Sequence, residues 1–158
     1  MKKKPFVIPA CVAVLLVFCL GAYGLLSWFG SPLIPGSLER RCAREVSAHG
    51  EELAAFAQTC LETDQVPETL PLPGLVKEAG VWGQGTQAFV EFTCGGWGLG
   101  SSTSYYGVYY SPSGPQPFQG AGVELTPQED GWAWQGEGDN WGVTRALGQG
   151  FYYFEVHF

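Results

Sequence analysis

The sequence predicts an α+β protein: an apolar N-terminal helix, then one long amphipathic helix packed on a curved antiparallel β-sheet, a meander. Three observations carry this prediction. No charged side chain occurs in the 25 residues from Pro5 to Phe29. Apolar residues at helical spacing then run through residues 38–63. Residues 75–158 instead form short alternating segments bounded by turn residues, which is typical of strands.

The apolar segment is long enough to cross a membrane, because about 20 helical residues span the hydrocarbon core. Lys2, Lys3 and Lys4 precede it, and such a basic flank is typical of the cytoplasmic side. We therefore expect residues 1–30 to be a cytoplasmic tail and a transmembrane anchor, with residues 6–29 in contact with membrane lipid. This places the protein in the cell membrane as a single-pass protein whose C-terminal domain is extracytoplasmic.

Two alternative interpretations concern the same segment. Ala22 and Gly24 are small residues at the spacing that a signal peptidase recognises, so a cleaved signal peptide stays open. A lipid-modified cysteine is disfavoured, because the bulky Phe18 precedes Cys19.

A linker and a second helix come next. Pro32 and Pro35 break any continuous helix, which marks residues 31–37 as a linker to a single α+β domain over residues 38–158. Ser37 is the expected N-cap. The apolar stripe of the helix, spaced by three or four residues, is Leu38, Cys42, Val46, His49, Leu53, Phe56 and Cys60.

The rest of the chain alternates as strands do. The expected strands are Leu75–Trp82, Gln87–Cys94, Ser104–Ser111, Gly122–Leu125, Gly131–Gln135, Trp141–Ala146 and Phe151–Phe158. The glycine-rich segment 95–102 precedes a strand rather than a helix and contains no Gly-Lys-Ser. We therefore expect a flexible hairpin loop there and no phosphate site.

Charge narrows the range of partners. From residue 38 onward the chain has 15 acidic and five basic residues, a formal charge of −10. Such a domain repels phosphate backbones, so nucleic acid is excluded as a partner. The acidic stretch from Glu129 to Asn140 does not have the spacing of a calcium loop, so we predict no metal site and no cofactor.

Candidate catalytic residues lack a local signature. A nucleophile would be Cys94 or one of the hydroxyls at residues 101–104, placed near His157, with Asp139 or Glu155 orienting the imidazole. No motif supports that assembly, so no catalytic residue is assigned. Cys94 shares a strand face with apolar neighbours and is expected to be a buried thiol. Pairing of Cys42 or Cys60 with Cys94 is left open.

Aromatic content exceeds that of an ordinary domain, with 15% of residues being Phe, Trp or Tyr. Consecutive tyrosines on a strand point to opposite faces, so some rings are expected near solvent, where they stack on sugars or contact a protein. The predicted binding residues are Tyr105, Tyr109, Trp132, Trp134 and Tyr153. Alternatively, the rings fill empty positions of a glycine-rich sheet.

Four segments carry a family resemblance. They are the run Ser-Thr-Ser-Tyr-Tyr-Gly-Val-Tyr-Tyr-Ser-Pro at residues 102–112, Gly-Trp-Ala-Trp at 131–134, Gly-Asp-Asn at 138–140 and Phe-Tyr-Tyr-Phe-Glu at 151–155. Over residues 75–158 the chain resembles uncharacterised single-pass, membrane-anchored proteins of Gram-positive bacteria. No activity attaches to them, so the resemblance implies anchorage without catalytic residues. The order of elements is also similar to type IV pilins, but the pilin signature is missing.

Two functional hypotheses follow. The first is a non-enzymatic extracytoplasmic domain that binds an envelope protein or a glycan through exposed aromatic side chains. The alternative is a cell-surface hydrolase or modifying enzyme that uses His157 and nearby carboxylates as an acid/base pair.

Overall fold

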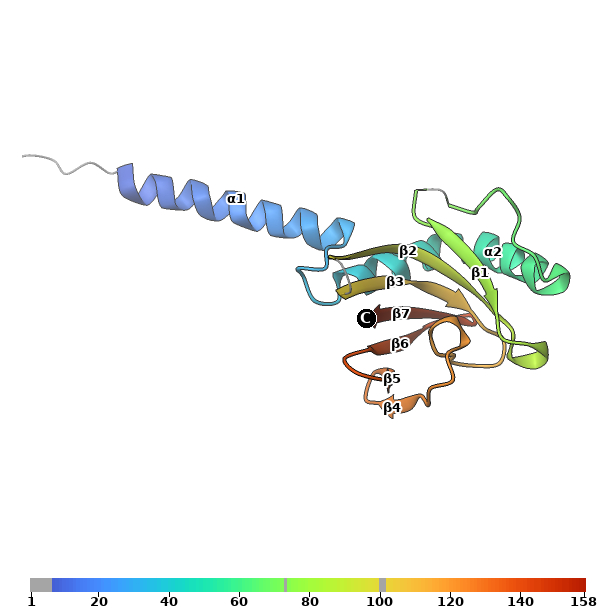
Figure 1. The fold of residues 1–158 in the computed structure, drawn as a ribbon. Helices are drawn as coiled ribbons and strands as arrows, with labels where there is room; N and C mark the ends of the chain where they lie inside the picture. Colours follow the sequence, from blue (N-terminus) through green and yellow to red (C-terminus); the bar gives the residue numbers. More distant parts are fainter. Residues whose placement is uncertain (1–6, 73, 100–101) are drawn as a thin grey trace, which may run out of the picture. The chain divides into compact units, whose positions relative to one another are not determined.

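The computed structural model describes residues 7–72, 74–99 and 102–158, and it confirms the predicted α+β class. It contains an N-terminal apolar helix, a second helix and a seven-stranded antiparallel sheet (Figure 1). Contacts divide the chain into two compact units, Met1–Arg41 and Cys42–Phe158.

The first unit is dominated by helix α1, Val7–Phe29. Within it, the window Val12–Phe29 has a mean hydropathy of 2.2 and none of it is buried by protein. A helix of this length and composition can span a membrane. Gly30, at φ 81°, follows its last residue.

The predicted linker has its own hydrogen bonds. The Ser37 hydroxyl donates to the Ser31 carbonyl oxygen at 2.8 Å and accepts from the Ser31 backbone N–H at 2.8 Å. Ser37 is the first residue of the next helix. An N-cap side chain bonds to the first backbone amides of its helix, whereas the Ser37 side chain bonds to the turn that precedes the helix.

Helix α2, Ser37–Thr63, buries one side as its apolar spacing predicts. His49 is the exception. It has non-helical backbone angles, φ −130° and ψ 16°, and its exposed side chain lies 3.8 Å from Glu52. The kink places Gly50 at the buried position instead. The side chains of α2 that are buried in the second unit are Cys42, Val46, Leu53, Ala57 and Cys60.

Seven strands form the sheet, and two short 3-10 helices interrupt the connections between them. The strands are β1 Glu78–Trp82, β2 Phe89–Leu99, β3 Ser102–Tyr110, β4 Thr126–Gln128, β5 Gly131–Gln135, β6 Trp141–Gly148 and β7 Phe151–His157. The 3-10 helices are η1 Gly85–Gln87 and η2 Phe118–Gly120. The fourth strand begins after the expected segment Gly122–Leu125, whose residues lie in the connection before it.

The strand order is β1-β2-β3-β7-β6-β5-β4, so the sheet is not one continuous meander. Strands β1–β3 and β4–β7 form two successive antiparallel groups, and β3 pairs with β7 in the centre. Residues 111–125 connect β3 to β4 at the far edge of the sheet. This connection crosses the sheet rather than forming a tight hairpin.

Both faces of the central strands are covered. Helix α2 covers one of them, here the helix face (Figure 1). On this face Phe56 of α2 packs on Phe92 with ring centroids 5.9 Å apart. The other, here the loop face, is covered by the connection 111–125. Its core consists of Phe89, Tyr109, Trp134, Phe154 and Val156, with Phe118, Val123 and Leu125 of the connection packed against it.

Strand β2 is longer than expected, because the glycine-rich segment continues it to Leu99. The hairpin loop predicted there is thus largely strand, and residues 100–101 lie outside the described residues. The β2–β3 register shifts between Thr93 and Gly95, which marks a β-bulge at Cys94. Aromatic rings cover several of the glycines. A Cβ on Gly142, for example, would lie 2.6 Å from the Trp134 indole.

Cysteine side chains in the second unit are buried. Cys60 and Cys94 are free thiols, so neither forms the pairing that the sequence left open, and Cys94 is buried as expected. Burial raises the pKa of the Cys60 thiol.

Candidate functional site

Five side chains on the helix face form a line across the sheet. Their residues are direct partners in adjacent strands, and the line runs from β2 through β3, β7 and β6 to β5. These residues, here the cross-strand row, are Trp97, Ser104, His157, Trp141 and Gln135. Since neighbouring strands lie about 4.8 Å apart, the row extends over roughly 19 Å. Its length suits an extended ligand.

His157 is the centre of the row and has a partner at each ring nitrogen. Its Nδ1 lies 2.8 Å from the Ser104 hydroxyl, and its Nε2 lies 3.2 Å from a Glu155 carboxylate oxygen. The Tyr153 hydroxyl donates to the other Glu155 oxygen at 2.7 Å. A neutral imidazole that accepts from Ser104 and donates to Glu155 satisfies all these groups. The network fixes the orientation of the ring.

Two indoles enclose the imidazole. Trp141 stacks on His157 with ring centroids 4.0 Å apart and an interplanar angle of 17°. Trp97 meets it edge-on at 5.9 Å and 75°, across the small side chain of Ser104. Trp141 is 41% exposed, whereas the other two rings are partly buried. The row therefore exposes the indole of Trp141 to solvent, while its stacking on His157 fixes the orientation of the ring.

Ser104, His157 and Glu155 have the composition of a hydrolytic triad but not its geometry. In a serine triad the hydroxyl contacts Nε2 and the carboxylate contacts Nδ1. Here the two contacts are exchanged, and Ser104 is only 8% exposed. The arrangement favours a hydroxyl that orients the imidazole. Of the groups that the alternative hypothesis names, His157 and the Glu155 carboxylate lie in contact.

The predicted binding residues are not brought together. Tyr109 and Tyr153 are each 1% exposed and lie on opposite faces of the sheet, and Trp134 is also buried. Tyr109 and Tyr153 lie in the central strands, which α2 and the connection 111–125 cover, so these two tyrosines and Tyr105 do not form one open patch. Trp132 is partly buried against Tyr152, at 6.3 Å between centroids. Tyr105 is 39% exposed.

Trp97, Trp141 and Gln135 are the site residues that the sequence did not single out. Strict alternation from Phe89 along β2 assigns Trp97 to the loop face. The bulge at Cys94 reverses that assignment and brings Trp97 into line with Ser104. The sequence signal for this change is the glycine-rich segment, because a glycine within a strand often marks a bulge.

Acidic and metal-binding side chains are dispersed. Among the residues that the structure describes, no three His, Cys, Asp or Glu side chains come together as metal ligands. In the acidic stretch before β6, Asp130 pairs instead with Arg145, with 3.0 Å between carboxylate and guanidinium. Its negative charge is thus satisfied within the domain.

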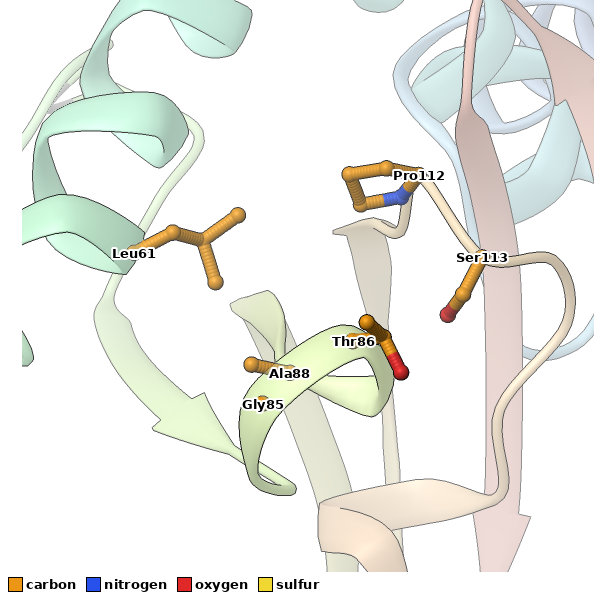
Figure 2. A pocket seen from close by; sticks show the side chains of 6 residues that line it. All are labelled: Leu61, Gly85, Thr86, Ala88, Pro112 and Ser113. Carbon is orange, nitrogen blue, oxygen red and sulfur yellow. The ribbon is translucent and has the colours of Figure 1, made fainter.

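A pocket of about 430 Å³ lies between the end of α2, the turn at η1 and the start of the connection 111–125. Figure 2 shows Leu61 directed from the helix toward Pro112 across this space. Its lining residues are Leu61, Gly85, Thr86, Ala88, Pro112 and Ser113. None of these six side chains ionises, so the pocket provides shape and apolar surface without acid/base groups.

Comparisons with protein-family models, with curated proteins and with solved structures find no match to this chain.

Proposed function

We propose that this chain is a single-pass membrane protein whose extracytoplasmic domain binds a glycan of the cell envelope through the cross-strand row. The membrane part of the proposal is supported by α1, which is 23 residues long and contains no charged side chain. The three lysines that precede the helix favour a cytoplasmic N-terminus. The acidic domain would then face the envelope.

A single observation carries the glycan part. Trp141 presents an exposed indole, while its other face is stacked on the hydrogen-bonded imidazole of His157. Flat amphipathic rings bind the apolar faces of sugars, and neighbouring polar groups bind the hydroxyls. Gln135 pairs with Trp141 in the next strand and has an exposed side chain. The row thus combines stacking and hydrogen bonding along one line.

The test is co-sedimentation of the full chain, in a polyoxyethylene detergent that carries no sugar, with insoluble cell-wall polysaccharide. Trp141→Ala removes the open ring, and we expect it to weaken binding about tenfold, the loss typical of one aromatic contact. Tyr105→Ala is the matched control, because Tyr105 is similarly exposed but lies on the loop face. Unchanged binding by Trp141→Ala would contradict the glycan proposal, and capture of an envelope protein through Trp141 would replace the glycan by a protein.

Membrane topology is tested separately. Protease added to intact cells should digest the domain, while cells permeabilised beforehand serve as the reference for full digestion. Protection of the domain in intact cells would place it on the cytoplasmic side.

The alternative, a hydrolase or modifying enzyme, rests on the Glu155–His157 pair and the adjacent Ser104 hydroxyl. Ser104→Ala separates the two proposals. Because Ser104 is almost buried, a binding row should lose little affinity for polysaccharide without its hydroxyl. Turnover of glycan or ester substrates that Ser104→Ala abolishes, with circular dichroism unchanged, would instead establish catalysis.

A further inference from the structure

A second pocket lies on the loop face, on the opposite side of the sheet from the cross-strand row. It encloses about 290 Å³, which suits a small ligand. Strands β1, β2 and β3, the end of the chain and η2 contribute its walls. The lining residues are Glu78, Thr93, Tyr105, Phe118, Gln119 and Phe158.

Three aromatic rings form one side of this pocket. The ring centroids of Tyr105 and Phe118 lie 6.4 Å apart, those of Tyr105 and Phe158 lie 6.3 Å apart, and those of Phe118 and Phe158 lie 5.8 Å apart. A cation is attracted to an aromatic ring when it lies within about 6 Å of the centroid. A triangle of this size lets one bound cation be that close to all three rings.

A carboxylate completes the enclosure. Glu78 is exposed at the start of β1 and pairs with Thr93 of β2, so its charge lies at the rim beside the Thr93 hydroxyl. No lining residue is basic. The domain as a whole is strongly acidic, with 15 acidic and five basic residues from residue 38 onward. Anions are repelled from such a pocket, whereas cations are attracted.

We propose that this pocket binds an organic ammonium group, with the three rings around the cation and Glu78 as its counter-charge. Rings and carboxylate act on the same ligand atom: the rings favour a poorly hydrated alkylated nitrogen, and the carboxylate favours its charge. The ammonium group is either that of a small free molecule or that of a lipid headgroup. The site is independent of the cross-strand row.

Glu91 holds one wall of the pocket in place and is a positioning residue. Its carboxyl group, 2% exposed, accepts a hydrogen bond from the Gln119 backbone N–H at 3.2 Å. Gln119 has a φ of 51°, which a residue with a side chain rarely adopts. The hydrogen bond therefore fixes η2 in a conformation that directs Phe118 toward Tyr105.

The experiment titrates choline into the full chain in a maltoside detergent, which carries no ammonium group, by isothermal calorimetry. The control ligand is dimethylbutanol, an uncharged isostere with carbon in place of nitrogen. We expect choline to bind about tenfold more tightly than the isostere. Equal binding of the two ligands, or no binding of choline, would overturn the proposal.

Variants assign the binding to the pocket. Glu78→Gln keeps the shape and removes the charge, and Tyr105→Ala removes one ring; each should weaken choline binding at least fivefold. Tyr105→Phe keeps the ring and should bind as the unmodified chain does. Glu124→Gln changes an exposed carboxylate outside the pocket and should have no effect. Full affinity in Glu78→Gln would overturn the proposal.

A last arm distinguishes the two sources of the ammonium group. Vesicles of phosphatidylcholine and of phosphatidylglycerol are each added to the full chain with and without saturating free choline. If free choline competes with phosphatidylcholine vesicles but not with phosphatidylglycerol vesicles, a lipid headgroup is a ligand. If free choline binds but competes with neither kind of vesicle, the ligand is a small molecule. Trp141→Ala should bind choline and vesicles as the unmodified chain does. A failure of the ammonium proposal can therefore be distinguished from a failure of the glycan proposal.

Discussion

Glu91 and Gln119 are joined by a hydrogen bond from a backbone amide to a carboxyl group in the interior of the domain. Burial raises the pKa of the Glu91 carboxyl from 4.5 to about 8; the amide of Gln119 lowers it in part, and the charge of Glu78 raises it further. At neutral pH Glu91 is therefore mostly protonated in the folded protein. The same group would be ionised in the unfolded chain.

This difference predicts how stability depends on pH. Between about pH 4.5 and about pH 8 the folded state holds a proton that the unfolded state has lost, so the contribution of Glu91 to stability falls as pH rises. In Glu91→Gln this contribution is absent. The unfolding free energy of Glu91→Gln minus that of the unmodified chain should rise by a few kcal/mol across this range, measured by urea unfolding. A difference that stays constant with pH would contradict it.

Removing the hydroxyl of Tyr109 should destabilise the folded domain. That hydroxyl lies 2.8 Å from the Thr144 hydroxyl and accepts from the Gln116 backbone N–H at 2.9 Å. Tyr109→Phe leaves the buried Thr144 and the amide of Gln116 without this partner, so we expect a loss of roughly 1–3 kcal/mol in unfolding free energy. Tyr105→Phe, at an exposed ring, should change it by less than about 0.5 kcal/mol. Equal effects of the two variants would refute the prediction.

Gly107 has no room for a side chain. A Cβ there would overlap the Phe92 carbonyl oxygen and lie 2.8 Å from the Phe154 ring. Gly107→Ala should therefore lower the unfolding free energy by roughly 1–3 kcal/mol, as overpacking does. Gly122→Ala is the control, because nothing lies within 4 Å of its Cβ. A Gly107→Ala chain as stable as the control would show that the centre of the sheet has room for an added methyl group.

Charged residues placed in helix α1 should release the chain from membranes. The exposed side chains of Leu16 and Val17 lie in its apolar window. Replacing both with Lys costs about 2.5–3.5 kcal/mol for each charge placed in the hydrocarbon core. We expect the unmodified chain to stay in the pellet after a carbonate wash and the double variant to appear in the supernatant. Leu33→Lys, outside the helix, should remain in the pellet, and release of the unmodified chain would contradict anchoring.

Sequence patterns located most strands because alternation is a local property. The expected Gly131–Gln135 is β5 as found, and the ends of β6 and β7 differ from expectation by a residue or two. Strand order is not local. The connection 111–125 carries the chain to the far edge of the sheet, and neither its composition nor its length specifies that course.

The candidate site escaped prediction for two physical reasons. A one-residue bulge at Cys94 reverses which face Trp97 occupies, and period-two alternation cannot detect it. The second reason is burial. The sequence predicts Tyr109 and Tyr153 as exposed binding residues, but in the structure both faces of the central strands are covered. His49 shows the same limit in α2, where a kink turns a residue of the apolar stripe to solvent.

The central place of β7 affects how the domain is made. It lies between β3 and β6, yet it follows every other strand in chain order. During synthesis, β3 and β6 each leave the ribosome with an unpaired backbone edge, and such edges are prone to aggregate. The sheet is therefore complete only once β7 has been added, and a truncation within β7 would leave β1–β3 and β4–β6 as two separate groups of strands.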